Sequence, residues 1–204
     1  MPTHSSMQFY LNWAKERIDE MDATLASLES KVSEVHADAR VKANQVLSDL
    51  REKCDEFRST VKKQAEANEA TWTKAKAQLE SEWSAFETEV KKYVDSFGKQ
   101  NEQQQATFKL QAAAQLKAWR EAADKLRSAG KEFAVERRGE IEATVKRMEA
   151  DAAAAEEKFQ KLNQAGLESW SALMGALAET RSSFDRANQA AQEAFKRAAQ
   201  SPPR

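Results

Sequence analysis

The sequence predicts an all-α protein, an elongated antiparallel helical hairpin or coiled-coil bundle. Glycine and proline are rare among the 204 residues, with five and three occurrences. Ala, Glu, Lys, Gln and Arg fill much of the chain, and these residues are good helix formers. Apolar residues recur in heptad-like spacings and in steps of eleven, and both spacings place them on one face of a helix. The few isoleucines and two tyrosines leave little signal for strands.

Residues 1–98 are predicted to form a first helical arm. Ser5, with Gln8 three residues later, has the pattern of a capping box at a helix start. No glycine or proline occurs from Thr3 to Phe97. If this arm is one unbroken helix, it has no compact core of its own, so its apolar stripe needs a partner. The stripe begins with Ile18, Met21, Leu25, Leu28, Val32 and Val35.

A turn between two arms is predicted at Gly98, followed by a helix start at Asn101. Glycine suits the position just past a helix end, and asparagine suits an N-cap. One pattern opposes a turn, because an eleven-residue ladder keeps its step across Gly98, as a continuous helix would. A continuous helix or a bundle of shorter helices therefore stays open beside the hairpin. If the chain folds back here, Phe57 should lie near Ile141. The ladder consists of Phe86, Phe97, Phe108 and Trp119.

Residues 99–200 are predicted to form a second helical arm that bends at glycines, and residues 201–204 a disordered tail. A glycine in a helix interior costs about 1 kcal/mol relative to alanine. Gly130 and Gly166 are the expected bends, which would divide the chain into three to five helices. The glycines of this arm are Gly130, Gly139, Gly166 and Gly175.

The residues that carry chemistry predict no catalytic, cofactor or metal site. His4 and His36 are the only histidines, and neither has a second ligand at the spacing of a zinc site. Cys54 precedes Asp55 and Glu56, whose charges oppose a reactive thiolate, so a core position is expected for it. The sequence has no phosphate-binding glycine loop and no nucleophile elbow. We therefore expect a protein that is not an enzyme.

Charge and hydrophobicity limit the partners. The 32 basic and 33 acidic residues give a net charge of −1, without the concentrated basic stripe of a nucleic-acid-binding protein. No apolar run approaches 18 residues, so no transmembrane segment is expected. The N-terminus lacks the charged start and apolar run of a signal peptide, so a cytoplasmic protein is expected.

The repeats resemble two families of surface-coating proteins. Over residues 72–198 the eleven-residue pattern is similar to that of exchangeable apolipoproteins, which coat lipid particles, although their proline punctuation is absent. The segment from Ser183 to Ala191, read as Ser-Phe-Asp-Arg-Ala-Asn-Gln-Ala-Ala, resembles phasins, which coat bacterial polyester granules. Both resemblances imply an amphipathic protein that lies on an apolar surface.

The leading prediction is a non-enzymatic coiled-coil scaffold that forms a homo-oligomer or binds partner helices through its apolar stripe. The alternative is an amphipathic protein that coats lipid or polyester-granule surfaces. Five tryptophans fit either function, because tryptophan anchors helix packing and also inserts at membrane interfaces. The predicted contact residues are Leu28, Val32, Val35, Trp83, Phe86, Trp119, Trp170 and Phe184.

Overall fold

A computed structural model describes residues 6–66, 69–97, 101–165 and 169–200. This part of the chain contains six long α-helices, one short 3-10 turn and no strand, which confirms the all-α bundle. The predicted cap at Ser5, the glycines Gly98 and Gly166 and the tail 201–204 lie outside the described residues. The helices are α1 (Ser6–Lys31), α2 (Ala37–Ala65), α3 (Glu69–Phe97), α4 (Asn101–Gly130), α5 (Val135–Ala165) and α6 (Trp170–Gln200), with the turn η1 (Val32–Glu34) after α1.

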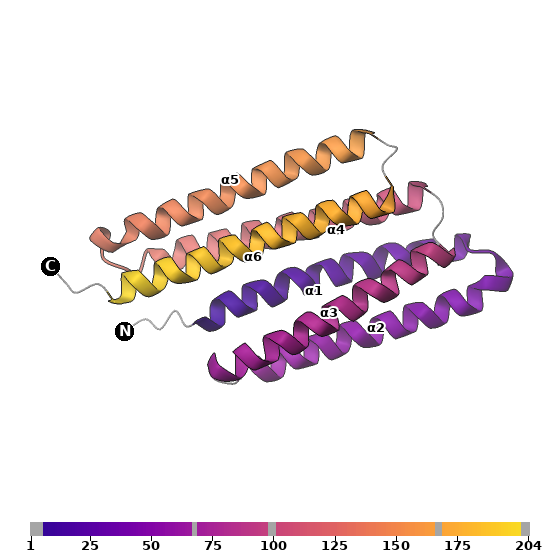
Figure 1. The fold of residues 1–204 in the computed structure, drawn as a ribbon, viewed down its shortest axis with the longest axis horizontal. Coiled ribbons are helices and arrows are strands. Elements are labelled where there is room, and N and C mark those ends of the chain that lie inside the picture. The colour runs from indigo at the N-terminus through magenta and orange to yellow at the C-terminus, as the bar shows by residue number, and fades with distance from the viewer. Residues whose placement is uncertain (1–5, 67–68, 98–100, 166–168, 201–204) are drawn as a thin grey trace.

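The six helices form two three-helix halves that lie side by side. Figure 1 shows α1, α2 and α3 on one side of the molecule and α4, α5 and α6 on the other. The central helices α1 and α4 are antiparallel: the Ser27 hydroxyl lies 2.7 Å from that of Thr107, and the Gln115 amide donates to Glu20 at 2.8 Å. Helix α6 packs on α4 and also reaches α1.

The first half has one apolar core and the second half has two, one of which includes Phe9 of α1, whereas the seam between α1 and α4 also buries polar residues. Trp72, Leu50 and Phe57 are fully buried in the first half, whereas Trp119 and Phe184 belong to the second. The seam instead buries hydroxyls and amides, several of which hydrogen-bond across it. Its buried polar residues are Glu20, Thr24, Ser27, Gln103, Thr107, Gln111 and Gln115.

The first arm is not one long helix, although no glycine or proline interrupts it. Helix α1 ends at Lys31, and Val35 and His36 are extended, with ψ of 138° and 141°. The Arg40 guanidinium donates to the carbonyl oxygens of Ser33 and Val35, at 3.0 and 3.2 Å. A side chain from the following helix thus satisfies carbonyls at the turn, so the chain reverses without a glycine.

The two arms do not pair as a simple hairpin. Helix α3 ends at Phe97 and α4 begins at Asn101. The expected proximity of Phe57 and Ile141 is wrong, because Phe57 lies in the core of the first half and Ile141 in that of the second. Each arm folds back on itself and buries most of its apolar stripe within its own half.

The two halves repeat each other at an offset of 98 residues. Arg138 donates to the carbonyl oxygens of Phe133 and Lys131, five and seven residues upstream, as Arg40 does at the equivalent turn. The α1–α2–α3 order recurs as α4–α5–α6. Four aromatic pairs keep this offset: Tyr10 and Phe108, Trp72 and Trp170, Phe86 and Phe184, and Phe97 and Phe195.

Two salt bridges recur at equivalent positions of the halves with their charges exchanged. In the first half Arg51 pairs with Glu29 at 2.6 Å, and Arg58 pairs with Asp22. In the second half the equivalent pairs have the opposite polarity: Arg127 pairs with Glu149, and Arg120 with Glu156. The halves are therefore similar in backbone and distinct in surface charge.

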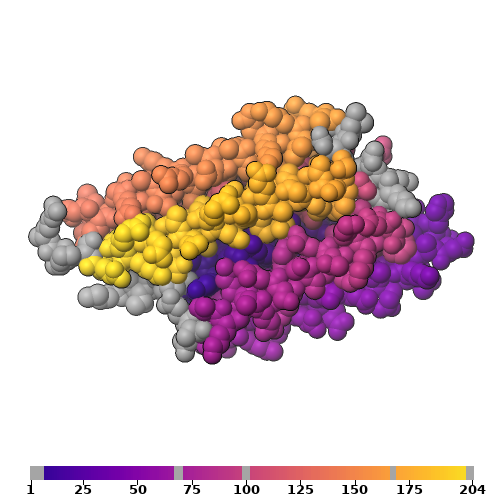
Figure 2. All heavy atoms as spheres, in the orientation of Figure 1, coloured from indigo at the N-terminus to yellow at the C-terminus, as the bar shows by residue number. Residues whose placement is uncertain are grey.

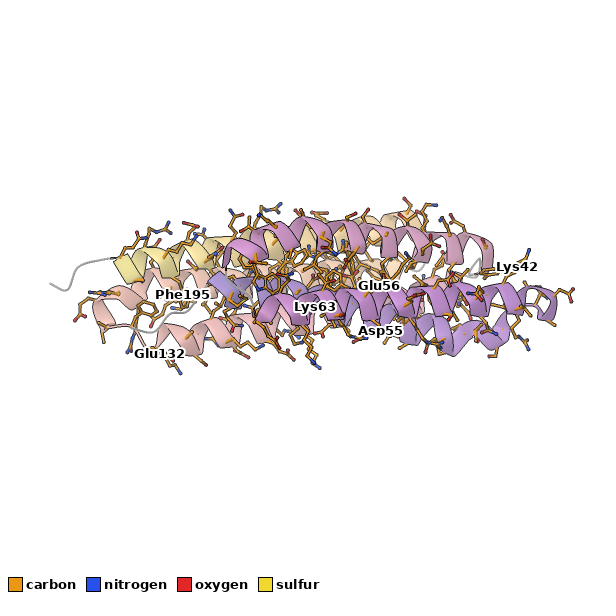
Figure 3. The ribbon with its side chains drawn as sticks, turned by 90° about the horizontal axis from the view of Figure 1, so that it is seen from below. Lys42, Asp55, Glu56, Lys63, Glu132 and Phe195 are labelled. Carbon is orange, nitrogen blue, oxygen red and sulfur yellow. The ribbon has the colours of Figure 1, made fainter. Side chains whose placement is uncertain are left out.

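The outer face of α2 is a solvated charged surface. Figure 3 shows the side chains of Lys42, Asp55, Glu56 and Lys63 along this helix, and all four are exposed. The neighbouring Cys54 points inward and is 1% exposed, which confirms its predicted core position. Burial raises the pKa of the Cys54 thiol to about 12, so the thiolate is disfavoured.

None of the helices, over the residues that the structure describes, is both long enough and apolar enough to cross a bilayer. Large apolar side chains that are exposed within the same ranges are few and lie on three different helices. They are Val41, Leu110 and Val135.

Replacing Gly130 with alanine is expected to destabilise the fold by about 1–3 kcal/mol. A Cβ at Gly130 would lie 2.8 Å from Cγ2 of Ile141, which is β-branched and 1% exposed, so it has little room to move. Gly139→Ala is the matched control, because nothing lies within 4 Å of its Cβ position. This control should stabilise the helix by about 0.5–1 kcal/mol. Urea unfolding followed by circular dichroism measures both, and a stabilising Gly130→Ala would contradict the close contact.

Candidate functional site

A groove between α3 and α6 is the candidate site. It encloses a cavity of about 540 Å³. Figure 2 shows the hollow between α3 and α6, with α1 visible beneath them. The deepest polar residues are Glu20 from α1 and Gln111 from α4. The apolar walls consist of Trp83, Phe86 and Val90 from α3 and Trp170 and Met174 from α6.

The α3 wall has the spacing that a helix uses to contact another helix. Trp83, Phe86, Glu87, Val90 and Lys91 recur at steps of one, three and four along two turns. Asp95 continues the row and pairs with Lys91 at 2.5 Å. The α3 wall therefore combines buried apolar residues with exposed charged groups, which are Glu87, Lys91 and Asp95.

A buried ion cluster lies at the base of the groove, centred on Arg181 of α6. Its guanidinium donates to both carboxylate oxygens of Glu20, at 2.8 and 3.2 Å, and lies 3.1 Å from Glu87. The same guanidinium stacks on the ring of Trp83, with its carbon 4.5 Å from the ring centroid. Arg181 thus joins three helices, α1, α3 and α6.

A second guanidinium, Arg17 of α1, extends the cluster towards α6. It binds both oxygens of Asp185 at 2.7 Å and one oxygen of Glu16 at 2.9 Å. It also stacks on Trp13, with a distance of 4.4 Å to the ring centroid. With Glu20 and Glu87, the cluster contains four carboxyl groups and two guanidinium groups.

Electrostatics within the cluster favour the uptake of positive charge. Burial raises the pKa of Glu16 to about 8, against the attraction of Arg17 and with the repulsion of Glu20. Partial desolvation also raises the pKa of Glu87, whose side chain is 46% exposed, although Arg181 opposes this. Burial alone would lower the pKa of Arg181, but the carboxylate of Glu20 raises it above its usual range. The surroundings thus stabilise the ionised forms of Glu16 and Glu87 poorly.

The lining of the groove supplies aromatic rings, carboxylates, amides and hydroxyls, with one lysine, Lys91, which pairs with Asp95. In the described ranges, no group of three or more His, Cys, Asp or Glu side chains is arranged to hold a metal ion.

Three of the eight predicted contact residues meet in the groove. Trp83, Phe86 and Trp170 line it together, although they come from different halves. Trp119 and Phe184 pack edge to face in the second core, with ring centroids 5.5 Å apart. The other three lie in or against the core of the first half, near the α1–α2 turn: Leu28, Val32 and Val35.

The polar residues of the groove were not anticipated from the sequence. Glu20, Glu87 and Arg181 resemble the many charges of a solvated helix face when only their spacing is considered. The available signal was a row of uncharged polar residues at steps of four on α4, which marks a polar helix face rather than an apolar one. The row is Gln103, Thr107, Gln111 and Gln115.

The fold defines an all-helical bundle protein made of two three-helix halves. Residues 15–129 match the family model described as PRESAN, Plasmodium RESA N-terminal, from within α1 almost to the end of α4. This match spans more than half of the chain, and the protein belongs to that family. No curated protein and no solved structure matches the chain, so the resemblances to apolipoproteins and phasins gain no support from a relative.

Proposed function

We propose that the protein is a non-enzymatic helical scaffold that binds a partner helix in the groove between α3 and α6. The observation that carries the proposal is the groove itself, where two tryptophans, a phenylalanine and a methionine line an open cavity of about 540 Å³. Aromatic and methionine side chains are enriched at recognition surfaces, where they supply most of the binding energy.

Helix-in-groove binding explains the arrangement of the walls. A partner helix presents apolar anchors at steps of three and four to a groove between helices. The α3 wall has the same steps, so the two surfaces can interdigitate over about two turns. The groove combines five apolar side chains with eight polar or charged residues, so hydrogen bonds and charge would select its occupant together with apolar contact.

A coat on lipid or granule surfaces is the alternative function. It requires a continuous apolar face, and the bundle turns its stripes inward to form cores. The exposed large apolar residues of the described ranges stand on separate helices. A coat would therefore need the bundle to open, whereas a scaffold uses the closed bundle.

Selection of helical peptides on the full-length protein tests the proposal. A displayed library of amphipathic helices, randomised on one face, should yield binders whose affinity falls at least about tenfold with Met174→Glu. This substitution places a charge on the half-buried wall of the groove. Val41→Glu is the matched control, because Val41 is 78% exposed and lies outside the groove.

Three other outcomes would overturn the proposal. Peptides whose affinity is unchanged by Met174→Glu would bind elsewhere on the bundle. Co-flotation of the protein with lipid vesicles, together with loss of helical packing, would support the coat. Sedimentation that shows a dimer dissociated by Met174→Glu would make a second copy of the chain the occupant of the groove.

A further inference from the structure

The internal repeat indicates what kind of helix the groove is built to contact. In the second half, one face of α6 is covered by α1. Arg181 of that face binds Glu20, Asp185 binds Arg17, and the amide of Asn188 donates to the carbonyl oxygen of Phe9 at 2.8 Å. These three positions thus form a helix-contact face that is already in use.

The equivalent face of α3, 98 residues earlier, lines the groove. Trp83, Glu87 and Val90 correspond to Arg181, Asp185 and Asn188. Helix α4 does not pack along this face of α3 in the way that α1 packs along α6. The chain therefore covers this face with α1 in one half, whereas in the other half Trp83 and Glu87 meet Arg181 of α6 and the face borders a cavity.

The charges of the groove specify a basic contact. Glu87 corresponds to Asp185, which receives a bidentate guanidinium from Arg17. The Glu87 side chain is 46% exposed, and its contact with Arg181 is 3.1 Å from a single nitrogen. The surrounding cluster has more carboxyl groups than guanidinium groups, so it can accept another cation.

The side-chain carbonyl oxygen of one glutamine in the groove also accepts no hydrogen bond from the part of the chain that the structure describes. The Thr24 hydroxyl donates to the Glu20 carbonyl oxygen, so it accepts from Nε2 of Gln111, which fixes the orientation of that amide. Gln111 lines the cavity and is 4% exposed, and its Oε1 has no hydrogen-bond partner among the described residues. A buried carbonyl oxygen of this kind is stabilised by a hydrogen-bond donor, which a lysine or arginine supplies.

We propose that the partner of the groove is an amphipathic helix that places a lysine or arginine against Glu87, as α1 places Arg17 against Asp185. Its apolar face rests on Trp170 and Met174, the half-buried apolar residues of the groove, and its basic side chain lies between Glu87 and Gln111. This inference rests on the function proposed above, and it adds the chemistry by which the scaffold distinguishes its partner from other amphipathic helices.

The selected peptides test this inference on the full-length protein. They should be enriched in lysine or arginine beside the apolar anchors, and changing that residue to glutamine should weaken binding about tenfold. Glu87→Gln should remove the difference between the basic peptide and its glutamine counterpart. Glu80→Gln is the matched control, because Glu80 lies on α3 outside the groove and pairs with Lys76.

The outcomes separate the two proposals. Peptides that depend on Met174 but bind equally with lysine, arginine or glutamine would overturn the basic contact and leave the scaffold function intact. If Met174→Glu changes the affinity of none of the peptides, both the scaffold function and the basic contact are overturned. Binding of the basic peptide that persists unchanged in Glu87→Gln would move the cation to another carboxylate and refute the assignment to Glu87.

Discussion

Replacing Arg181 with methionine is expected to lower the free energy of unfolding by about 3–5 kcal/mol. The change leaves Glu20 buried, with 2% of its side chain exposed, and without its guanidinium partner. The remaining donor to its carboxylate is the amide of Gln115 at 2.8 Å. An unpaired buried charge is costly because the interior solvates it poorly. Chemical denaturation at neutral pH, followed by circular dichroism, measures the loss.

Two variants show whether charge burial causes this loss. Glu20→Leu combined with Arg181→Met removes both charges and should recover most of the stability, since buried pairs can be replaced by apolar residues at little cost. Arg197→Met removes an exposed guanidinium that pairs with Glu140 and should change stability little. A double variant no more stable than Arg181→Met alone would show that packing on Trp83, rather than charge, dominates.

Raising the pH from about 5 to about 8 is expected to destabilise the protein through Glu16. Its pKa is about 8 in the folded chain, against an ordinary value of 4.5, because the side chain is buried. In that range the folded chain retains a proton that the unfolded chain has lost. The stability present at low pH therefore decreases by about 1.4 kcal/mol per pH unit for one proton, and levels off above the folded pKa.

Glu16→Gln tests this dependence, because glutamine keeps the shape and cannot ionise. The difference in stability between the two proteins isolates Glu16 from its neighbours, which are Arg17, Glu20, Arg181 and Asp185. The variant should be the more stable protein above pH 8. As a control, Glu140→Gln should act only in the acid range, since Arg197 lowers the pKa of Glu140. Parallel stability curves for Glu16→Gln and the unmodified protein would refute the raised pKa.

The sequence was sufficient for the all-α class, because helix formation depends largely on local chemistry. Few glycines and prolines, regular apolar spacing and the Gly98–Asn101 pattern act within one or two turns of chain. The turn at Val35 and His36 was not predictable in this way. Its carbonyls are satisfied by Arg40 of the following helix, and an arginine at that position has no distinctive sequence signature.

The site was only partly predictable, because its chemistry depends on contacts between distant helices. The aromatic residues Trp83, Phe86 and Trp170 could be identified as special by size and rarity. The pairing of Glu20 with Arg181 joins residues 161 positions apart, and no local pattern distinguishes them from solvated charges. The offset of 98 is present in the aromatic pairs. Several of the same residues also fit steps of eleven, which is the simpler pattern to recognise.

The exchanged polarity of the salt bridges bears on how the chain finds its fold. Because the halves share a backbone plan, α1 could dock on α5, and α4 on α2, while the chain condenses. Such misassembly would bring Glu29 towards Glu149 and Arg51 towards Arg127. The other pair gives the same result, with Asp22 facing Glu156 and Arg58 facing Arg120. Like charges would meet in both of these exchanged pairings, which disfavours them relative to the native pairing.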